Sequence, residues 1–469
     1  MDLIGVNVAV IGLGASGFAA ARLAVEKGGD VYVSDARTND AAAARGAALG
    51  DTGVDVELGR HDIERMVDAG FVVASPGIPP DAPVLRALAD RGVRWISEPE
   101  FAARFLSGSL IGITGTNGKT TTTLLVDHLL RCSGIRSAAG GNVGGGLAPA
   151  ASDLARSGEP YDWVVLEMSS FQLAGVDNFR PDIGVVTNLS PDHLDRYGSV
   201  AAYYEDKARL FDNAGSDSTW VLPFADPDVS ALARDAAGRR FYFDGSVPTP
   251  GGRHDSADRH AFVDDGVLFL RTDGEIEELI EVEDLPLLGA HNVTNALTAA
   301  LVARLAGAQI GGLSAGLGSV RALPHRLEPV REVGGVLWVN DSKATNVAAT
   351  RSAIGSLDRP IVLLVGGKDK EEDFAELAPI MAGRVSRVLA YGAAGPRVDA
   401  ALRSAFSGHP GMPDVEMVEG TLDRVVARAT EVAHPGAVVL LSPACSSFDM
   451  YENYEVRGQH FCDLVRGLA

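Results

Sequence analysis

Short apolar runs alternate with helix-like stretches along most of this 469-residue chain. The first series begins at Val6–Ile11, passes through the alanine-rich stretch Ala15–Lys27 and returns to an apolar run at Val31–Ser34. Apolar runs that do not alternate with polar residues are typical of parallel strands covered on both faces. Parallel strands need long crossover connections, and the helix-like stretches provide them. The pattern therefore predicts an α/β fold.

Three series of this kind follow one another, which predicts three domains. Further strands are expected at Phe71–Ser75 and Val93–Ile96 in the first series, at Leu110–Thr114, Trp163–Glu167 and Ile183–Thr187 in the second, and at Val336–Asn340, Ile361–Val365, Val388–Tyr391 and Val438–Leu441 in the third. A usual domain length of about 100–200 residues also suggests three domains. We place them at residues 1–107, 108–322 and 323–469. The stretch Ser246–His260, rich in Gly, Pro, Asp and His, is expected to be a loop.

The charge of the chain restricts its partners. The formal net charge is -21 at pH 7 and the pI is near 4.9, which argues against nucleic-acid binding because that needs clustered cationic surface.

No apolar run reaches the ~18 residues that span a bilayer, and the N-terminus lacks the cationic start of a signal peptide. The three cysteines have no metal-type spacing, and their odd number favours a reducing compartment. We expect a cytoplasmic, monomeric enzyme that acts on small molecules without membrane insertion.

A glycine loop follows the first expected strand. Gly12, Gly14 and Gly17 form the pattern GxGxxG, and Asp35 ends the next strand. Glycines let the backbone approach a phosphate, and the helix that follows presents its positive end to the same anion. Taken alone, the pattern predicts an NAD site, but a nucleotide-sugar pyrophosphate fits the same physics and a tight turn without a ligand is the third interpretation. The segment Ser75–Pro79 either completes an anion site or is only a turn.

The segment Thr114–Thr120, with the sequence TGTNGKT, lies between an expected strand and an expected helix. It predicts a phosphate loop in which backbone N–H groups surround the phosphates, Lys119 neutralises the β and γ oxygens, and the Thr120 hydroxyl binds Mg²⁺. Ile113 occupies the first glycine position of the general pattern, so the match to phosphate loops at large is incomplete. A non-catalytic nucleotide-binding protein would carry the same loop.

Polar residues also follow the other strands of the second series. Glu167 ends a strand, where open α/β sheets bind ligands, and is a candidate Mg²⁺ ligand. His193 follows the next strand among carboxylates, although such histidines more often make structural hydrogen bonds. By its spacing alone, Lys207 is interpreted as part of a solvated helix face. In the third series, Cys445 fits a small buried residue better than a nucleophile, since no partner base is indicated.

The third series carries basic and hydroxyl residues at its strand ends, which suit phosphate or carboxylate ligands. These segments are Leu323–Arg326, Asn340–Asn346, Gly366–Lys370 and Leu441–Asp449. Together with the two glycine-containing loops they resemble the Mur ligases over the whole chain. Asp341–Asn346 and Ser442–Ser447 are similar to the corresponding segments of the D-glutamate-adding members, and the Asp-Asn-Pro-Arg motif of the meso-diaminopimelate-adding members is absent from the sequence.

This resemblance implies a Rossmann-like domain for a nucleotide-sugar, a central P-loop ATPase-like domain and a C-terminal Rossmann-like domain for an amino acid. The implied reaction is ATP-dependent ligation of D-glutamate to UDP-N-acetylmuramoyl-L-alanine through an acyl phosphate, which yields ADP and phosphate during peptidoglycan precursor synthesis. Two alternatives stay open. One is another amino-acid-adding or folylpolyglutamate-type ligase. The other is an NAD(P)-dependent oxidoreductase, which leaves the Lys119 loop unexplained.

The resemblance further implies roles for individual residues. The residues that would contact ATP are Gly115, Thr116, Asn117, Gly118, Lys119, Thr120, Thr121, Asn142, Asn295, Arg326 and Asp341. Those that would hold two Mg²⁺ ions are Thr120, Glu167, His193 and a carbamylated Lys207. The UDP-sugar would lie against Ala15, Ser16, Asp35, Arg37, Ser75, Gly77 and Asn142, and D-glutamate against Lys343, Thr345, Lys370, Ser447 and Phe448. The catalytic roles would fall to Lys119, His193, Lys207 and Lys343. Some relatives carry leucine in place of Phe448, which alters the shape of the pocket only.

Overall fold

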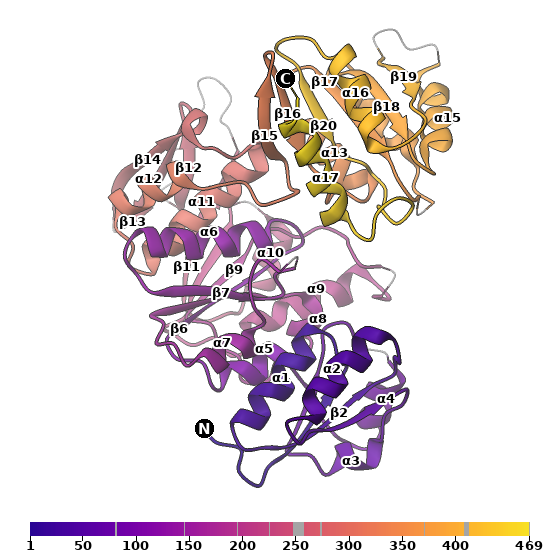
Figure 1. Cartoon of the computed structure of the whole chain (residues 1–469). Coiled ribbons are helices and arrows are strands. Elements are labelled where there is room, and N and C mark those ends of the chain that lie inside the picture. Colours follow the sequence, from indigo (N-terminus) through magenta and orange to yellow (C-terminus); the bar gives the residue numbers. More distant parts are fainter. Residues whose placement is uncertain are drawn as a thin grey trace. The chain divides into compact units, whose positions relative to one another are not determined.

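The computed structural model describes residues 1–79, 82–144, 146–194, 196–224, 226–246, 258–272, 274–369, 371–407 and 412–468. The chain forms two compact units, one of Met1–Asp284 with Thr294–Gly318 and one of Leu285–Val293 with Ser319–Ala469. Among the described residues the first unit contains a five-stranded and a nine-stranded sheet, and the second contains a six-stranded sheet (Figure 1). Each predicted α/β series thus corresponds to one sheet, whereas the domain boundaries placed at 107/108 and 322/323 stay a prediction.

The first sheet is parallel and has the strand order β3-β2-β1-β4-β5. Its strands are β1 (Asn7–Ile11), β2 (Asp30–Asp35), β3 (Asp55–Leu58), β4 (Phe71–Ala74) and β5 (Ile96–Ser97), and its helices are α1 (Ala15–Glu26), α2 (Asp40–Gly50), α3 (Ile63–Val67), α4 (Pro83–Ala89) and α5 (Glu98–Ala103). From β1 the chain continues to β2 and β3 on one side of β1, and it then crosses to β4 and β5 on the other side. The loops after β1 and β4 therefore meet at a switch point. The strand expected at Val93–Ile96 was placed too early, because the Val93 N–H caps α4 by donating to the Leu88 carbonyl.

The second sheet has the order β14-β13-β12-β11-β10-β9-β6-β8-β7. Its strands are β6 (Ser109–Thr114), β7 (Ser137–Gly141), β8 (Trp163–Glu167), β9 (Ile183–Val186), β10 (Thr219–Pro223), β11 (Arg239–Asp244), β12 (Arg259–Asp264), β13 (Val267–Thr272) and β14 (Glu275–Glu281). Its helices are α6 (Lys119–Cys132), α7 (Ala151–Ser157), α8 (Ser170–Leu173), α9 (Val200–Ala208), α10 (Pro227–Leu232), α11 (Ala290–Leu305) and α12 (Ile310–Ser319). The strand β13 is antiparallel to both of its neighbours, β12 and β14. His260 lies in β12 rather than in the predicted loop, and residues 247–257 of that loop lie outside the described residues.

The third sheet has the order β15-β16-β20-β17-β18-β19, with only β15 antiparallel to its neighbour among the described pairs. Its strands are β15 (Glu328–Val333), β16 (Val336–Asn340), β17 (Ile361–Gly366), β18 (Val385–Tyr391), β19 (Asp414–Met417) and β20 (Val438–Leu441). Its helices are α13 (Val347–Gly355), α14 (Ala378–Met381), α15 (Gly395–Phe406), α16 (Leu422–Val432) and α17 (Tyr454–Arg466). Short 3₁₀ helices occur at Arg209–Phe211, Val282–Asp284 and Phe374–Leu377.

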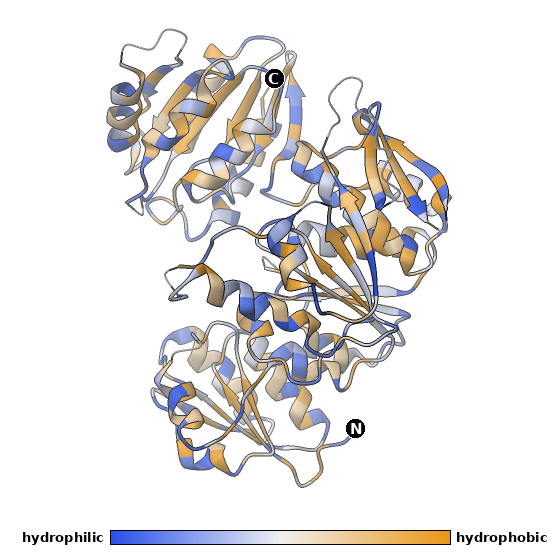
Figure 2. Cartoon of the chain, turned by 180° about the vertical axis from the view of Figure 1, so that it is seen from behind, coloured by the Kyte–Doolittle hydropathy of each residue, from blue (hydrophilic) through white to orange (hydrophobic). Residues whose placement is uncertain are grey.

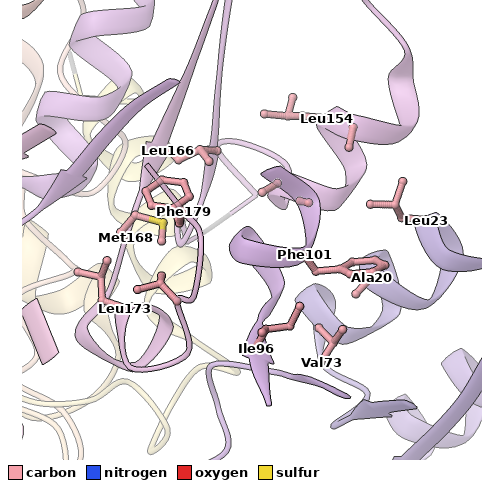
Figure 3. Close-up of a cluster of buried hydrophobic side chains, with 14 of the residues drawn as sticks. Ala20, Leu23, Val73, Ile96, Phe101, Leu154, Leu166, Met168, Leu173 and Phe179 are labelled. Atoms are coloured by element: carbon pink, nitrogen blue, oxygen red, sulfur yellow. The ribbon is translucent and has the colours of Figure 1, made fainter. Parts of the chain in front are cut away.

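Apolar side chains concentrate on the strands, which appear mostly orange in Figure 2. In the first unit one buried cluster joins the two sheets. Figure 3 shows Phe101 of α5 beside Ala20 of α1, while Leu166, Met168 and Phe179 group together from the second sheet and the segments that follow it. Burial of this shared apolar surface holds the two sheets in one body. No described helix is long and apolar enough to cross a membrane.

Candidate functional site

The TGTNGKT loop connects β6 to α6, and α6 begins at Lys119. Gly118 caps this helix with a left-handed φ of 81°, and a Cβ there would lie 2.4 Å from Asn295 Oδ1 of α11. Both the backbone conformation and the close approach therefore require glycine. The first N–H groups of a helix have no acceptor within the helix, and its dipole is positive at that end. The loop thus offers N–H donors and positive potential to an anion.

The loop after β9 shapes the phosphate loop. Asn188 accepts the Thr116 N–H at 2.9 Å through its carbonyl and the Asn117 N–H at 3.0 Å through its side-chain oxygen. The Lys119 amine folds over its own loop and donates to the carbonyls of Gly115 and Thr116 at 3.0 and 2.8 Å. The loop is therefore held in one conformation, with a lysine amine at the place where phosphate oxygens would bind.

A pocket of about 290 Å³ lies where the loops of the two sheets of the first unit meet. The described residues that line it are Pro76, Gly77, Lys119, Asn142, Ser169, Ser170, Phe171, His193, Tyr203 and Lys207. The structure therefore brings together residues predicted for the UDP-sugar, for ATP and for Mg²⁺. Sequence reasoning did not select Pro76, Tyr203 or the three residues Ser169–Phe171. All five lie within four residues of a predicted site residue, Gly77, Glu167 or Lys207. That proximity in the sequence is the signal that could have found them.

Glu167 and Asn142 meet beside this pocket. The Asn142 side chain donates to Glu167 Oε1 at 3.3 Å, and the Asn142 N–H donates to the Glu167 carbonyl at 2.9 Å. Glu167 Oε2 is buried and has no hydrogen-bond partner among the described residues. A buried carboxylate oxygen in this state suits a cation. Thr120, in the first turn of α6, is also buried. No group of three or more His, Cys, Asp or Glu side chains gathers among the described residues, so Mg²⁺ would need phosphate or water oxygens as further ligands.

Lys207 does not lie on a solvated helix face, as its spacing suggested. Its side chain is 1% exposed, and its amine donates to the Gly115 carbonyl at 2.7 Å and lies 4.7 Å from the centre of the Tyr203 ring. Burial, and secondarily the charge of Lys119, lower the pKa of the Lys207 amine well below its ordinary value. The amine therefore contacts the phosphate loop at Gly115 and lines the same pocket as Lys119, without an ion pair to any described carboxylate.

His193 lies at the rim of the pocket in a left-handed backbone conformation with φ 55°. Its ring is 5.3 Å from the ring of Phe171 and 6.0 Å from that of Tyr203, measured between centroids. Its Nε2 is 3.7 Å from an Asp192 oxygen, and nearly half of the side chain is exposed. The histidine is oriented by aromatic contacts and keeps an exposed edge that a ligand can reach.

At the switch point of the first sheet, Gly17 packs against the turn of the first glycine loop, where a Cβ would lie 1.9 Å from the Gly12 carbonyl oxygen. Ser75 donates its hydroxyl to the same oxygen at 3.0 Å. Asp35 accepts the Leu13 N–H at 2.6 Å and three bonds from Arg37, through the backbone N–H at 2.8 Å and the guanidinium at 3.0 and 2.7 Å. Of the other predicted UDP-sugar residues, Ala15 and Gly77 are exposed and Ser16 is half-buried. Asp35 thus orients both the loop and Arg37.

The ionisation of Asp35 leads to a prediction about stability. Burial by itself would raise its pKa, but the hydrogen bonds from Arg37 and Leu13 outweigh burial and lower the pKa from 3.8 to about 2. The stabilisation is therefore complete above pH ~4 and is lost as the pH falls through about 2. We expect Asp35→Asn to lower the free energy of unfolding at pH 7 by about 1.5–3 kcal/mol, the usual value for a hydrogen bond to a charged group. Denaturant unfolding at pH 7 and pH 3 should show the deficit shrinking at pH 3, and an equal deficit at both would contradict this account.

Thr121 follows Thr120 in α6 of the first unit, and the predicted residues from Arg326 onward belong to the second compact unit. Asp341 follows β16, where its carboxylate accepts the Ser442 hydroxyl at 2.8 Å and the Leu327 N–H at 3.2 Å. Burial raises its pKa to about 7, while the bonds from Ser442 and Leu327 and the charge of Arg326 act in the opposite direction. β16 and β20 are neighbours, so their carboxyl ends place Asp341 and Ser442 together.

Lys343 and Ser447 follow the same two strands. The Lys343 amine lies 5.4 Å from the centre of the Tyr454 ring, Thr345 is half-buried, Ser447 is buried, and Phe448 is 64% exposed. Lys370 lies outside the described residues. Cys445 is fully buried, which confirms its interpretation as a buried small residue, and burial raises its thiol pKa to about 12.

Sequence reasoning missed Arg457 of α17, which is completely buried. Its guanidinium donates to the Ser342 carbonyl and hydroxyl at 2.9 and 3.0 Å, and to the carbonyls of Cys445 and Ser446 at 3.1 and 3.3 Å. It therefore ties the Lys343 segment to the Ser447 segment. An arginine inside an amphipathic helix pattern carries no signal of such a role, because the pattern does not show what the side chain reaches.

The fold and the site together define an α/β protein. A phosphate loop follows a strand of one sheet, a second glycine loop follows a strand of another, and residues suited to binding an anion follow the strand ends of the third. Comparison with known families gives three matches. The Mur ligase MurD-like N-terminal domain matches residues 6–97, the Mur ligase middle domain matches residues 113–303, and the glutamate ligase domain of Mur ligases matches residues 325–445.

Curated relatives match over the full length. The UDP-N-acetylmuramoylalanine--D-glutamate ligase of Acidobacterium capsulatum is 42% identical over 100% of this chain and 98% of its own length. The protein of the same name from Geotalea uraniireducens is 41% identical over 100% of this chain and 99% of its own length. The chain belongs to the Mur ligase family.

Solved structures share the fold at low sequence identity. A pseudomurein peptide ligase type C from Methanothermus fervidus is 20% identical, with a TM-score of 0.57 over 98% of this chain and 99% of that one. UDP-N-acetylmuramate-alanine ligase from Thermotoga maritima is 18% identical, with the same TM-score and the same coverage of both chains. The predicted three-domain α/β class is confirmed by these likenesses and by the family matches.

Proposed function

We propose that this chain joins D-glutamate to UDP-N-acetylmuramoyl-L-alanine at the expense of ATP, in peptidoglycan precursor synthesis. The observation that carries the proposal is the pocket in which Gly77 of the first sheet meets Lys119, Asn142, His193 and Lys207 of the second. A nucleotide-sugar on the first glycine loop and a triphosphate on the second would extend toward one another there. The full-length relatives named for this reaction support the choice of substrates.

The reaction proceeds in two steps. An oxygen of the precursor's terminal carboxylate attacks the γ-phosphorus of ATP, the bond to the bridging oxygen breaks, and ADP leaves. The D-glutamate amine then attacks the acyl carbon, phosphate leaves, and the amine loses a proton as the amide forms. Carboxylate and triphosphate are both anionic, so charge is the main obstacle. The Lys119 amine and the N–H groups at the start of α6 lower that obstacle by binding the transferred phosphoryl group.

Thr120 and Glu167 would hold a first Mg²⁺, and His193 with a modified Lys207 a second. The buried, unpartnered Glu167 oxygen supports the first site. Bound there, Mg²⁺ supplies positive charge that offsets the negative charge of the phosphates. Arg326, Asp341 and Asn295 would contact the nucleotide. Lys343, Thr345, Lys370, Ser447 and Phe448 would bind D-glutamate, in a third domain that begins at residue 323.

Lys207 would carry a carbamate. A lysine amine adds to the carbon of CO₂ and loses a proton, which turns a cation into an oxygen ligand that carries a negative charge. The burial of Lys207 against the phosphate loop, without an ion pair to a described carboxylate, supports this assignment, because a buried ammonium group at that point is costly. The three cysteines are free thiols, which supports a reducing, cytoplasmic location.

Phosphate release provides the test of the substrates. We expect the protein with ATP, Mg²⁺ and UDP-N-acetylmuramoyl-L-alanine to release phosphate continuously only when D-glutamate is added. L-glutamate, L-lysine and meso-diaminopimelate are the matched controls, and mass spectrometry of the product should show one added glutamate. Release that depends equally on another amino acid would assign a different ligase, and binding of NAD(H) without phosphate release would assign an oxidoreductase.

A further inference from the structure

Helix α5 lies at the junction of the two sheets of the first unit. The residue before it, Ser97, donates its N–H to the Gly175 carbonyl of the second sheet's segments at 2.8 Å. Phe101 of α5 is completely buried in the cluster that both sheets share (Figure 3). The helix has six residues, and two of them are glutamates. A helix this short at an apolar junction would be expected to carry no buried charge.

Both glutamates are nevertheless buried, Glu98 at 0% and Glu100 at 1% exposure. Glu98 Oε1 accepts the N–H of Ser152, in the first turn of α7, at 2.5 Å. Glu100 Oε2 accepts three consecutive N–H groups, those of residues 177, 178 and 179, at 3.1, 3.1 and 2.7 Å, and its Oε1 pairs with Arg104 at 2.8 Å. Each carboxylate thus binds the backbone of the second sheet's segments from a helix that belongs to the first.

The two contacts have different costs. Glu100 is fully compensated by its N–H donors and Arg104, whereas Glu98 Oε2 has no hydrogen-bond partner among the described residues. Burial accordingly raises the pKa of Glu98 to about 7, against the hydrogen bonds from Ser152. An incompletely compensated buried carboxyl contributes little to stability, so its contact with α7 invites an explanation in terms of position.

Glu98 is linked to the pocket through α7. The loop between β7 and α7 begins at Asn142, which lines the pocket, and is closed by a bond from the Gly141 N–H to the Pro149 carbonyl at 3.2 Å. The next residues form the first turn of α7, which Glu98 holds. Asn142 itself is held by Glu167 of β8, so the Glu98 contact acts on the distance between the second sheet, which carries Asn142, and the first sheet, whose loop carries Gly77.

We propose that Glu98 and Glu100 are positioning residues that set the distance between the nucleotide-sugar half of the pocket and the half that carries Asn142 and Lys119. The proposal rests on the proposed function, since it assumes that a UDP-linked substrate spans both halves. On the proposed function UDP alone would lie on the first glycine loop, so its binding should not depend on the two contacts. The muramoyl-alanine part would extend into the pocket toward Asn142, so its binding should depend on them.

The test compares the binding of UDP and of UDP-N-acetylmuramoyl-L-alanine by calorimetry. In Glu98→Ala we expect the affinity for the full precursor to fall by about tenfold, the size of effect that a residue acting through the protein has on the coupling between two parts of a site. The affinity for UDP and the KM for ATP should change less than about twofold. Glu98→Gln keeps an oxygen acceptor for the Ser152 N–H and should restore most of the precursor affinity. Glu100→Gln should show the same split between the two ligands in weaker form.

Arg94→Ala is the matched control, because Arg94 pairs with Asp177 at 2.6 Å across the same junction while 80% of its side chain is exposed. It should leave both affinities unchanged, since exposed ion pairs contribute little. Equal losses for UDP and precursor in Glu98→Ala, or no loss for either ligand in that variant, would overturn the proposal. If Glu98→Ala does not fold, Glu100→Gln decides by the same split between the two ligands. Failure of the unmodified protein to bind the precursor at all would refute the proposed function instead.

Discussion

Lys119→Ala should reduce ATP-dependent phosphate release to about a thousandth of the normal rate or less. The amine lies 2.8–3.0 Å from two carbonyls of its own loop, so it is already in place when a triphosphate binds. Losing one preorganised donor to a developing anion typically costs about 10²–10³-fold in kcat. The alanine substitution also removes a full positive charge from a site with two anionic reactants. Steady-state assays with D-glutamate and precursor at saturation give the measurement.

Lys27→Ala is the control for Lys119→Ala. Lys27 follows α1 with its amine near the Phe105 ring, far from the phosphate loop in the sequence, and its removal should leave turnover unchanged. Thermal unfolding of both variants separates loss of chemistry from loss of fold. Turnover of Lys119→Ala within a few-fold of normal would remove this residue from the mechanism.

Lys207→Ala should lose about 100-fold or more of the activity, and short carboxylates such as formate or acetate should restore part of it. The alanine leaves a space beside the Gly115 carbonyl and the Tyr203 ring, which a small carboxylate can enter to replace the oxygens of the carbamate. Loss of a group that holds or orients a metal ligand commonly costs about 10–100-fold. Rate measurements at increasing formate concentration give the result directly.

Lys207→Arg is the matched variant, because a guanidinium keeps the positive charge but does not form the carbamate. We expect it to be as inactive as Lys207→Ala and to resist rescue, since the arginine side chain fills the space. Full activity of Lys207→Arg, or no response of Lys207→Ala to any carboxylate, would show that the lysine acts as a cation. Both variants should bind UDP normally, because Asp35 and Arg37 lie in the other sheet.

The fold class followed from the sequence because a short, continuous apolar run is a local property. β6, β8, β16 and β20 begin and end within a residue of their expected positions. The misplaced strand at Val93 had the right apolar residues, but its first N–H was already used to end α4. β15 and β14 are exposed, polar strands whose pairing depends on their neighbours rather than on their own residues.

For the site, the sequence alone determined that two glycine-containing loops each lie between a strand and a helix and that the second loop carries a lysine, because glycines and a lysine at fixed spacing can be identified directly in the sequence. The ligand of the first loop stayed open between NAD, a nucleotide-sugar and none. Only the tertiary structure decided that Lys207 is buried against the phosphate loop, that Asp35 accepts hydrogen bonds from Leu13 and Arg37, and that Glu98 joins the two sheets. Each of these features depends on which distant backbone group a side chain contacts. Burial and hydrogen bonding between segments far apart in the chain produce no periodic pattern in the sequence.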